Sequence, residues 1–235
     1  MTAPASSSHG LRLAQPRVGI VSSRRRLCAA LCRPLDEAVA LLSEQVEAAA
    51  TSGVEFFQVR EPDLDAAALL TLVQALSAVS SGRVRIVVND RADVASAAGV
   101  ALHLKGASMP VERLRSWLPP TTWISGAAHD VAEARRMVAV DALLAGTVRD
   151  TISKDPGTPR LGMTGLAGVV AASARPVFAI GGMTAADWPA VGATGAVGIV
   201  AIGWMLPRAN EGAGDGVVRA MRELGAVVDD GDGVS

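Results

Sequence analysis

Histidine is the side chain best suited to move a proton near neutral pH, and the sequence contains His9, His103 and His129. His129 follows the apolar segment at residues 121–127, where a strand would end and a site could begin. His103 lies inside the apolar run VALHL, so we expect a buried, hydrogen-bonded histidine with a structural role. His9 belongs to a Ser-rich N-terminal segment. We predict that His129 is the acid/base residue; the alternative is a neighbour of a helix N-cap with no chemistry.

A second group of residues could bind a phosphate. Gly181 and Gly182 end the apolar segment PVFAIGG and lead into a helix that starts near Thr184. Glycine amides at a helix N-terminus can donate hydrogen bonds to an anion without interference from a side chain. In a parallel barrel the backbone of Val200 and Ala201, in the next apolar segment, would lie beside them. We predict a phosphate site here; the alternative is a tight turn that needs glycine for backbone reasons alone.

The loop at residues 146–162, GTVRDTISKDPGTPRLG, carries hydroxyls and a cation beside the predicted phosphate site. Thr151 and Ser153 supply two hydroxyl donors, and Lys154 supplies a compact ammonium that binds phosphate as a point charge. The loop is long and shows no regular pattern, which favours a functional or a mobile segment. We predict that these three residues bind substrate; an ordinary polar connector is the alternative.

Gln58 and Arg60 occupy alternate positions, so both side chains would face the same side of a strand. If that side is a barrel interior, the arginine needs an anion, because an unpaired buried charge is costly. The anion is either a substrate group or a neighbouring carboxylate, Glu61 or Asp90. Asn89 could hydrogen-bond to substrate, and Asp90 could hold Mg²⁺, although one carboxylate alone does not make a metal site.

Eight short apolar segments alternate with Ala-rich segments whose apolar residues recur at helical spacing. Strands that are buried on both faces and separated by helices pair in parallel, and eight such units close into a (β/α)8 TIM barrel. An open doubly wound sheet is disfavoured, because no G-x-G-x-x-G motif follows the first segment. In a barrel, the residues named above lie where substrates bind, at the C-terminal ends of strands. The predicted strands are residues 17–22, 54–60, 85–90, 100–104, 121–127, 141–146, 176–182 and 196–202.

Composition limits the class of partner. A net charge of −1 argues against a nucleic-acid ligand, and the cluster Arg24–Arg26 is typical of a solvated loop. No apolar segment is long enough to span a membrane, and the N-terminus lacks the apolar core of a secretory signal. We expect Cys28 and Cys32 to be free thiols in a cytoplasmic protein. The expected divisions are a disordered tail at residues 1–16, one barrel domain at 17–226 and a flexible acidic tail at 227–235.

The same residues give the chain a resemblance to a known family. From about residue 17 to about residue 205 it resembles the thiamin-phosphate synthase family, which includes the thiazole tautomerases of the TenI type. The order of the matching blocks agrees with that of the predicted strands, and the resemblance implies a TIM barrel that acts on a thiazole phosphate in thiamin biosynthesis. The blocks are QVRE at 58–61, VVNDRADVA at 87–95, GVALHL at 99–104, GAAHDVAEA at 126–134, AGTVRDTISK at 145–154 and FAIGGMTAAD at 178–187.

Two departures separate the sequence from the synthases. The resemblance implies that a synthase joins a pyrimidine diphosphate to thiazole phosphate, using a Lys just after Q-x-R-E and Mg²⁺ between two Asp residues. Here Pro62 stands at the position of that Lys, and Ser108 stands at the position of the second Asp. Asp90 matches the first Asp. The sequence therefore lacks a diphosphate-binding cation and half of a metal site at the expected positions.

What remains resembles the tautomerases, which aromatise a thiazole carboxylate phosphate by moving a proton and need no metal. On this resemblance His129 is the acid/base, and Gln58 and Arg60 contact the substrate, Arg60 through a bidentate pair with its carboxylate. We therefore expect a tautomerase with no cofactor, and Mg²⁺ only if the chain is a synthase. A synthase with altered diphosphate binding and a non-catalytic sensor of a phosphate ligand are the alternatives. A homodimer is left open.

Overall fold

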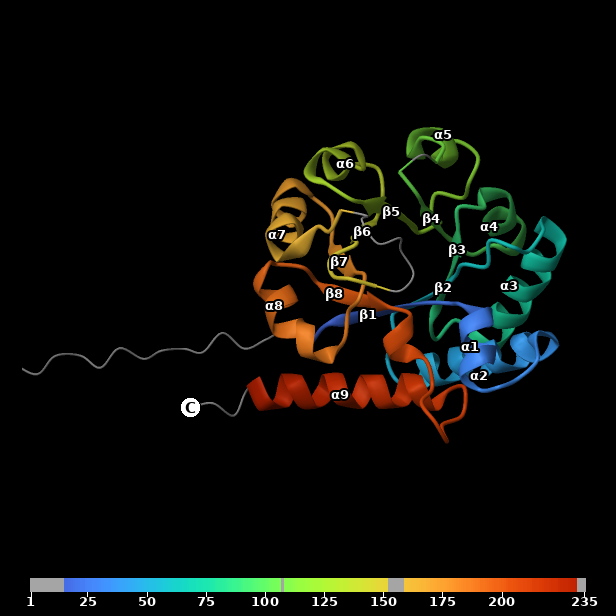
Figure 1. Cartoon of the computed structure of the whole chain (residues 1–235). Coiled ribbons are helices and arrows are strands. Elements are labelled where there is room, and N and C mark those ends of the chain that lie inside the picture. The colour runs from blue at the N-terminus through green and yellow to red at the C-terminus, as the bar shows by residue number, and fades with distance from the viewer. Residues whose placement is uncertain (1–14, 107, 152–158, 232–235) are drawn as a thin grey trace, which may run out of the picture.

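Eight parallel strands form a closed barrel, in which neighbours follow the order of the chain and β8 pairs with β1 (Figure 1). The computed structural model describes residues 15–106, 108–151 and 159–231. The predicted (β/α)8 TIM barrel is confirmed. The strands are β1 (Arg17–Val21), β2 (Phe56–Val59), β3 (Arg85–Asn89), β4 (Ala101–Leu104), β5 (Ile124–Ala128), β6 (Ala142–Ala145), β7 (Val177–Ile180) and β8 (Gly198–Ala201).

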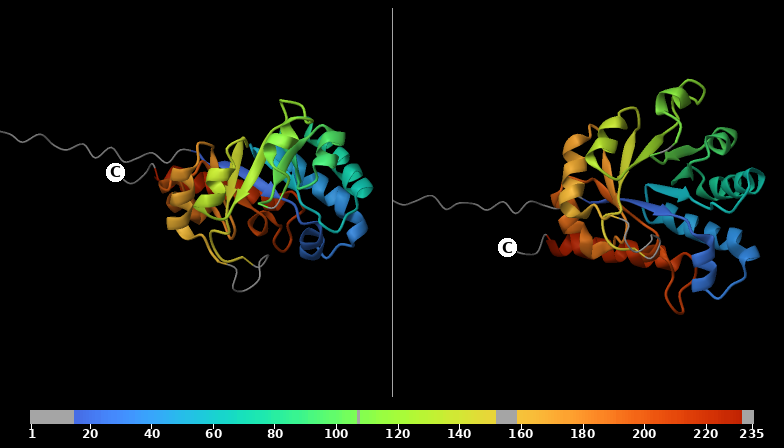
Figure 2. Two further views of the ribbon diagram at one scale, coloured as in Figure 1. Left: turned by 90° about the horizontal axis from the view of Figure 1, so that it is seen from above. Right: turned by 45° about the horizontal axis from the view of Figure 1, so that its top comes forward.

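Helices surround the barrel, as the further views in Figure 2 show. Their inner faces bury leucines such as Leu42, Leu76 and Leu166, each of which stabilises the fold by roughly 1.5–3 kcal/mol. The helical elements are α1 (Arg24–Ala30), η1 (Leu35–Glu37), α2 (Ala38–Thr51), α3 (Ala66–Ser80), α4 (Ala92–Ala98), α5 (Val111–Arg115), α6 (Val131–Arg136), α7 (Gly162–Ala172), η2 (Ala185–Asp187), α8 (Trp188–Ala193), η3 (Gly203–Met205) and α9 (Asp215–Gly231).

The strand β5 begins later than the apolar pattern predicts. The sequence favours a start at Thr121, whereas the strand begins at Ile124. The Thr122 N–H donates to the Pro119 carbonyl at 2.9 Å, which closes a turn just before the strand. The turn takes up the first residues of the apolar segment, and the strand continues instead to Ala128, next to His129.

The helix α1 begins in the cluster Arg24–Arg26, where the sequence predicts a solvated loop, and this prediction is wrong. Arg24 is buried, and its guanidinium lies 3.0 Å from Asp63 Oδ2 and 3.8 Å from Glu61 Oε2. Glu61 also accepts hydrogen bonds from the Arg24 N–H at 3.0 Å and from Ser22 Oγ at 2.6 Å. Burial raises the pKa of Glu61, although these two hydrogen bonds oppose the shift. The buried carboxylate thereby fixes the start of α1 against the segment after β2.

Alternate residues of the strands fill the inside of the barrel. The rings of Phe56 and Phe178 meet edge to face, with centroids 5.4 Å apart. Gly19 on β1 makes room for this pair, because a Cβ atom at this position would overlap the Phe56 ring. The interior is therefore a packed core below the strand ends.

The N-terminal end of the barrel is closed by charged and aromatic side chains. The Arg85 guanidinium lies 4.8 Å above the centre of the Trp123 ring, and that of Arg17 lies 5.2 Å from the centre of Phe178. Glu55 joins the two arginines, at 2.5 Å from Arg17 and 3.5 Å from Arg85. These side chains cover the core of the barrel at its N-terminal end.

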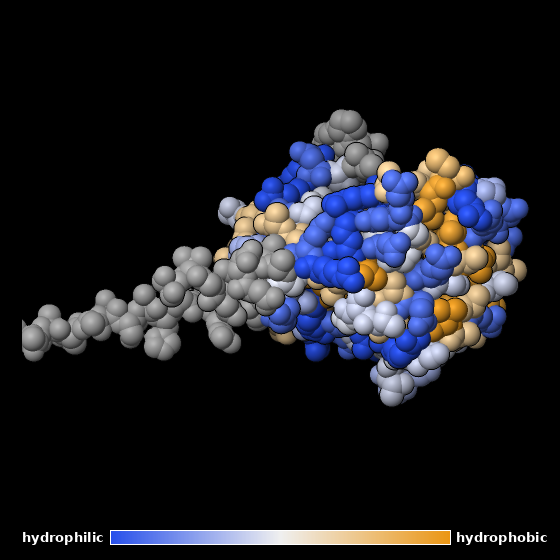
Figure 3. All heavy atoms as spheres, turned by 90° about the horizontal axis from the view of Figure 1, so that it is seen from below, coloured by the Kyte–Doolittle hydropathy of each residue, from blue (hydrophilic) through white to orange (hydrophobic). Residues whose placement is uncertain are grey.

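The helix α9 covers the lower side of the barrel in Figure 1 and buries Val217, Ala220 and Leu224. Figure 3 views the molecule from this side, where hydrophilic residues dominate the centre of the face. Because α9 continues to Gly231, the flexible tail expected from residue 227 is corrected: its first residues are helical, and 232–235 lie outside the described residues. Most of the expected N-terminal tail lies outside them too. Within the described chain, no helix is long and apolar enough to cross a membrane.

Candidate active site

A cavity of about 420 Å³ opens at the C-terminal ends of the strands. A larger cavity of about 680 Å³ lies at the opposite end, beside Arg83 and Trp123. We place the site in the first, because barrel chemistry occurs at that end and because it contains every described residue that the sequence predicts to be catalytic or to bind substrate or phosphate. Those residues are Gln58, Arg60, Asn89, His129, Thr151, Gly181, Gly182, Val200 and Ala201.

The described lining of this cavity is positively charged. Arg26 and Arg60 contribute cations, Lys105 contributes a third that is paired with Asp90 behind the lining, and no Asp or Glu is among the described residues that line the cavity. The whole chain carries a net charge of −1, so this concentration of positive charge is local. A cavity lined by one sign of charge concentrates ligands of the opposite sign. The cavity is therefore suited to an anionic ligand.

Gly181 and Gly182 form a turn that other residues could not adopt. Their φ angles are 106° and 66°, in the region that favours glycine. A Cβ atom on Gly181 would overlap the Thr147 side chain, and one on Gly182 would overlap the Asp150 carbonyl. The prediction that this turn needs glycine for its backbone conformation is thus correct. It does not exclude the phosphate reading, because within the described chain neither glycine N–H has a hydrogen-bond acceptor.

The segment after the glycine turn is held by Asp187. Its Oδ2 accepts hydrogen bonds from the Thr184 N–H and from Thr184 Oγ1, both at 2.9 Å. Its Oδ1 lies 2.7 Å from the guanidinium of Arg149, in the loop after β6. One carboxylate therefore fastens the loops after β6 and β7 to each other, beside the glycine amides.

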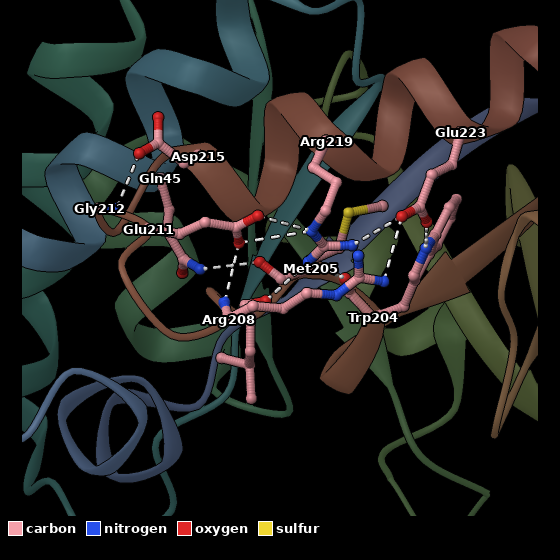
Figure 4. Close-up of polar contacts among 10 residues, drawn as sticks. Gln45, Trp204, Met205, Arg208, Glu211, Gly212, Asp215, Arg219 and Glu223 are labelled. Atoms are coloured by element: carbon pink, nitrogen blue, oxygen red, sulfur yellow. Dashed lines mark hydrogen bonds and ion pairs between the residues drawn. The ribbon is translucent and has the colours of Figure 1, made fainter.

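The loop after β8 is fastened to α9 by the polar network in Figure 4. Trp204, one of the residues that line the cavity, donates its indole N–H to Glu223 at 2.7 Å. Arg219, only 15% exposed, lies between Glu211 at 3.0 Å and Glu223 at 3.3 Å. It also donates to the carbonyls of Trp204 at 3.2 Å and Leu206 at 2.9 Å. Arg219 thus supplies hydrogen-bond donors to the backbone carbonyls of the turn that contains η3.

Replacement of Arg219 by Met should lower the free energy of unfolding by about 2 kcal/mol, since charge-assisted hydrogen bonds to two carboxylates and two carbonyls are lost. Urea unfolding measures the change. The matched control is Arg222→Met, an exposed arginine on the same helix, which should change it by less than about 0.5 kcal/mol. Equal effects of the two substitutions would show that the network does not stabilise the fold.

His129 lies directly after β5 at the rim of the cavity, with 51% of its side chain exposed. Its Nδ1 lies 2.8 Å from Glu133 Oε2, which also accepts the His129 N–H at 2.7 Å. Asp130 caps α6 by accepting the Glu133 N–H at 2.7 Å, and so places Glu133 opposite the ring. A proton on Nδ1 leaves Nε2 as a proton acceptor, and the carboxylate can stabilise the imidazolium that forms.

His103 is buried and hydrogen-bonded, as the sequence predicts, with Nδ1 2.9 Å from Ser125 Oγ. Burial lowers the pKa of His103 to about 4, although the charge of Asp90 opposes the shift. The ring nevertheless lines the cavity, because His103 occupies the same face of β4 as the interior residue Ala101. The prediction of a buried, hydrogen-bonded histidine is thus confirmed, and this neutral imidazole also forms part of the cavity wall.

Gln58 and Asn89 present amide groups to the cavity from neighbouring strands. Gln58 Nε2 donates to Asn89 Oδ1 at 3.0 Å, and Gln58 is only 3% exposed. Its Oε1 atom is buried and has no hydrogen-bond partner within the described chain. Buried polar atoms are nearly always hydrogen-bonded, so this oxygen is suited to accept a hydrogen bond from a ligand.

Arg60 extends into the cavity from the end of β2 with an exposed side chain. Its guanidinium has no hydrogen-bond or ion-pair partner among the described residues. The alternative prediction, that Arg60 pairs with Glu61 or Asp90, is wrong. Glu61 instead binds Ser22 and Arg24, and Asp90 binds Lys105. The guanidinium is therefore available for an anion.

Asp90 is neutralised by neighbours on the segment after β4. Lys105 Nζ lies 2.7 Å from Asp90 Oδ2, and Ser108 Oγ donates a hydrogen bond to Oδ1. Burial would raise the pKa of Asp90, but the hydrogen bonds from Lys105 and Ser108 outweigh it and lower the pKa. In the described part of the chain, no three His, Cys, Asp or Glu side chains cluster as metal ligands. These residues do not fit a magnesium site, since an ammonium already occupies the position of the cation.

The comparisons with known proteins identify the family. The model of the family described as thiamine monophosphate synthase matches residues 29–204. This chain belongs to that family.

Curated family members include a thiamine-phosphate synthase from Anaeromyxobacter dehalogenans, 34% identical over 184 residues, which cover 77% of this chain and 83% of the relative. Another, from Methanoculleus marisnigri, is 35% identical over 180 residues, covering 75% and 82%. Among solved structures, thiamine phosphate pyrophosphorylase from Pyrococcus furiosus superposes with a TM-score of 0.70 at 24% identity. The match covers 94% of this chain and 98% of that structure, and it shows the shared fold.

The sequence predicts nine of the residues that line the cavity of this family member, but it misses Arg26, Lys105 and Trp204 in the lining and Glu133 beside His129. Glu133 lies four residues after His129, and this helical spacing is a signal that could have identified it. Arg26, Lys105 and Trp204 follow strands without a local pattern that marks them. Of the predicted substrate loop, Thr151 lines the cavity, while Ser153 and Lys154 lie outside the described residues.

Proposed function

We propose that this chain is a thiazole tautomerase, which aromatises a thiazole carboxylate phosphate by moving a proton. The observation that carries the proposal is the 2.8 Å pairing of His129 with Glu133 at the rim of the cavity. The positive lining favours an anionic substrate, and the family favours a phosphate of thiamin biosynthesis. No cofactor takes part in the proposed reaction.

In this proposal the substrate phosphate accepts hydrogen bonds from the amides of Gly181 and Gly182 and from the backbone that follows Val200 and Ala201. The glycine amides support this, because no described residue accepts from them. Thr151, with Ser153 and Lys154 from the rest of the same loop, binds the substrate beside the phosphate. This anchoring leaves the ring in the mouth of the barrel.

Two further groups then orient the ring. The Arg60 guanidinium forms a bidentate pair with the substrate carboxylate, an arrangement that its fork of donors matches. The unpaired Gln58 Oε1 accepts a hydrogen bond from the substrate, and Asn89 holds the Gln58 amide in place.

The proton moves from a saturated ring carbon to a carbon outside the ring that is joined to it by a double bond, so the reaction needs no oxidant and no second substrate. His129 Nε2 takes a proton from the saturated ring carbon. The electron pair of the broken C–H bond becomes part of the aromatic system. The exocyclic double bond moves into the ring, and the imidazolium, stabilised by Glu133, returns a proton to the carbon outside the ring. Formation of the aromatic product in the presence of EDTA tests this proposal.

The second candidate is the synthase activity, which the names of the curated relatives favour over the tautomerase. The contacts of Asp90 weigh against it. Both carboxylate oxygens are engaged by Lys105 and Ser108, and Pro62 stands where the resemblance calls for a lysine. A family member that cannot hold Mg²⁺ at this point lacks the ion that would neutralise a leaving diphosphate.

We expect little or no Mg²⁺-dependent condensation of a pyrimidine diphosphate with thiazole phosphate. The measurement is thiamin phosphate formation by the purified protein over a range of Mg²⁺ concentrations. A synthase from the same family serves as the positive control for substrates and detection. Robust, Mg²⁺-dependent formation of thiamin phosphate would make the synthase the primary activity and reject the tautomerase assignment.

A further inference from the structure

The cluster Arg24–Arg26 at the start of α1 contains two structural arginines and one that faces the cavity. Asp63 accepts the guanidinium of Arg24 at 3.0 Å and that of Arg25 at 2.5 Å. Arg26 instead lines the cavity, and its guanidinium has no ion-pair or hydrogen-bond partner among the described residues. One cation of the three is therefore available to a ligand.

The Arg26 guanidinium lies against the loop after β8. A Cβ atom built on Gly203 would be 3.0 Å from Arg26 Nη2, so the guanidinium lies against this glycine and would have to shift if the residue carried a side chain. Gly203 lies two residues after Ala201, the last residue of β8, and β8 pairs with β7, which Gly181 and Gly182 follow. Arg26 thus approaches the predicted phosphate site from the side opposite the glycine turn, across the loop after β8.

The position of Arg26 is fixed by its own helix. Leu27 is fully buried, and Arg24 is held by Asp63 and Glu61. An arginine on an anchored helix loses less freedom when it binds than one on a loose loop. The charge is therefore placed beside the loop before a ligand arrives.

We propose that Arg26 is a phosphate-binding residue. Its guanidinium donates two hydrogen bonds to the phosphate oxygens that the amides after β7 and β8 leave unsatisfied, in the bidentate manner typical of arginine. The identity of the phosphate as that of a thiazole rests on the proposed function; the site itself requires only a phosphate monoester.

This assignment divides the two available guanidinium groups of the cavity between two anions. Arg26 lies beside the loop after β8, whereas Arg60 extends from β2, whose neighbours in the barrel are β1 and β3. A ligand with a phosphate at one end and a second anionic group at the other would engage both. The cavity should therefore select ligands with two separated anionic groups over those with one.

The test compares Arg26→Gln with Arg25→Gln, a control from the same cluster whose side chain is 67% exposed and paired with Asp63. Dissociation constants are measured by calorimetry for thiazole phosphate and for the thiazole alcohol that lacks the phosphate. Arg26→Gln should weaken thiazole phosphate binding by about ten- to hundredfold, as expected for loss of charge-assisted hydrogen bonds, and leave the alcohol unchanged. Arg25→Gln should change neither ligand, and thermal unfolding checks that both variants are folded.

A second variant tests the geometry without removing the charge. Gly203→Ala should push the guanidinium away from the loop and weaken phosphate binding by a smaller factor than Arg26→Gln. Unchanged phosphate affinity in folded Arg26→Gln, or an equal loss for the phosphate and the alcohol, would overturn the proposal. A selective loss of phosphate binding in a protein without tautomerase activity would support Arg26 and reject only the proposed function.

Discussion

Replacement of His129 by Asn should lower turnover of thiazole carboxylate phosphate by about 10²–10⁴-fold, the usual contribution of general acid–base catalysis. Substrate affinity should change little, because the phosphate and the carboxylate supply most of the anchoring. Asn fills a similar volume and can still donate to Glu133, but it cannot take up a proton. Steady-state kinetics should therefore show a fall in kcat with a nearly constant KM.

Glu133→Gln is the companion variant, because Glu133 acts through His129 and is a positioning residue. It should lower kcat less than His129→Asn, since the amide can still hydrogen-bond to the ring but cannot stabilise an imidazolium as a carboxylate does. If His129→Asn keeps full turnover while His103→Asn loses it, the acid/base is the other histidine. If neither loses turnover, the acid–base assignment fails altogether.

Acid should destabilise the fold through His103, by about 3 kcal/mol between neutral pH and pH 4. Burial lowers the pKa of His103 to about 4 from an ordinary value of 6.5. As the pH falls through this interval, the unfolded chain binds a proton on this ring that the folded chain does not, so stability falls with pH. Urea unfolding at a series of pH values measures the slope.

The matched variant is His103→Gln, which removes the titrating ring from the same site. It should be less stable than the natural chain at neutral pH, because Ser125 loses its partner, yet lose less stability on acidification. The raised pKa of Glu61 acts in the opposite direction to His103, and the lowered pKa of Asp90 acts in the same direction. Both groups are present in the two proteins, so the difference between the slopes isolates His103; identical slopes would contradict its buried, neutral state.

The barrel could be predicted from the sequence because its strands are buried on both faces. Such strands are continuous apolar segments, and each of the eight predicted segments overlaps a strand of the barrel. The same reasoning places Gly181, Gly182 and His129 at strand ends, since the ends of parallel strands meet at one edge. The order of apolar and polar residues along the chain was sufficient for these predictions, because strand burial and strand ends are set by neighbouring residues.

Contacts between distant segments could not be predicted in this way. Lys105 reaches Asp90 only because β3 and β4 are neighbours, and Arg26 reaches Gly203 only because β8 closes on β1. An Arg-rich segment resembles a solvated loop unless a buried partner such as Glu61 is known. The sequence thus predicts which strand ends carry the site, but not which of their charges pair with one another and which remain for a ligand.

The decisive measurement follows the ultraviolet absorbance of thiazole carboxylate phosphate incubated with purified protein in EDTA, without pyrimidine diphosphate. Our proposal predicts that the absorbance of the aromatic thiazole appears with the natural chain and is nearly abolished in His129→Asn. An unchanged spectrum with the natural chain, together with tight binding of the phosphate, would point instead to a ligand sensor. An unchanged spectrum together with thiamin phosphate formation once Mg²⁺ and the diphosphate are supplied would contradict the tautomerase and favour the synthase.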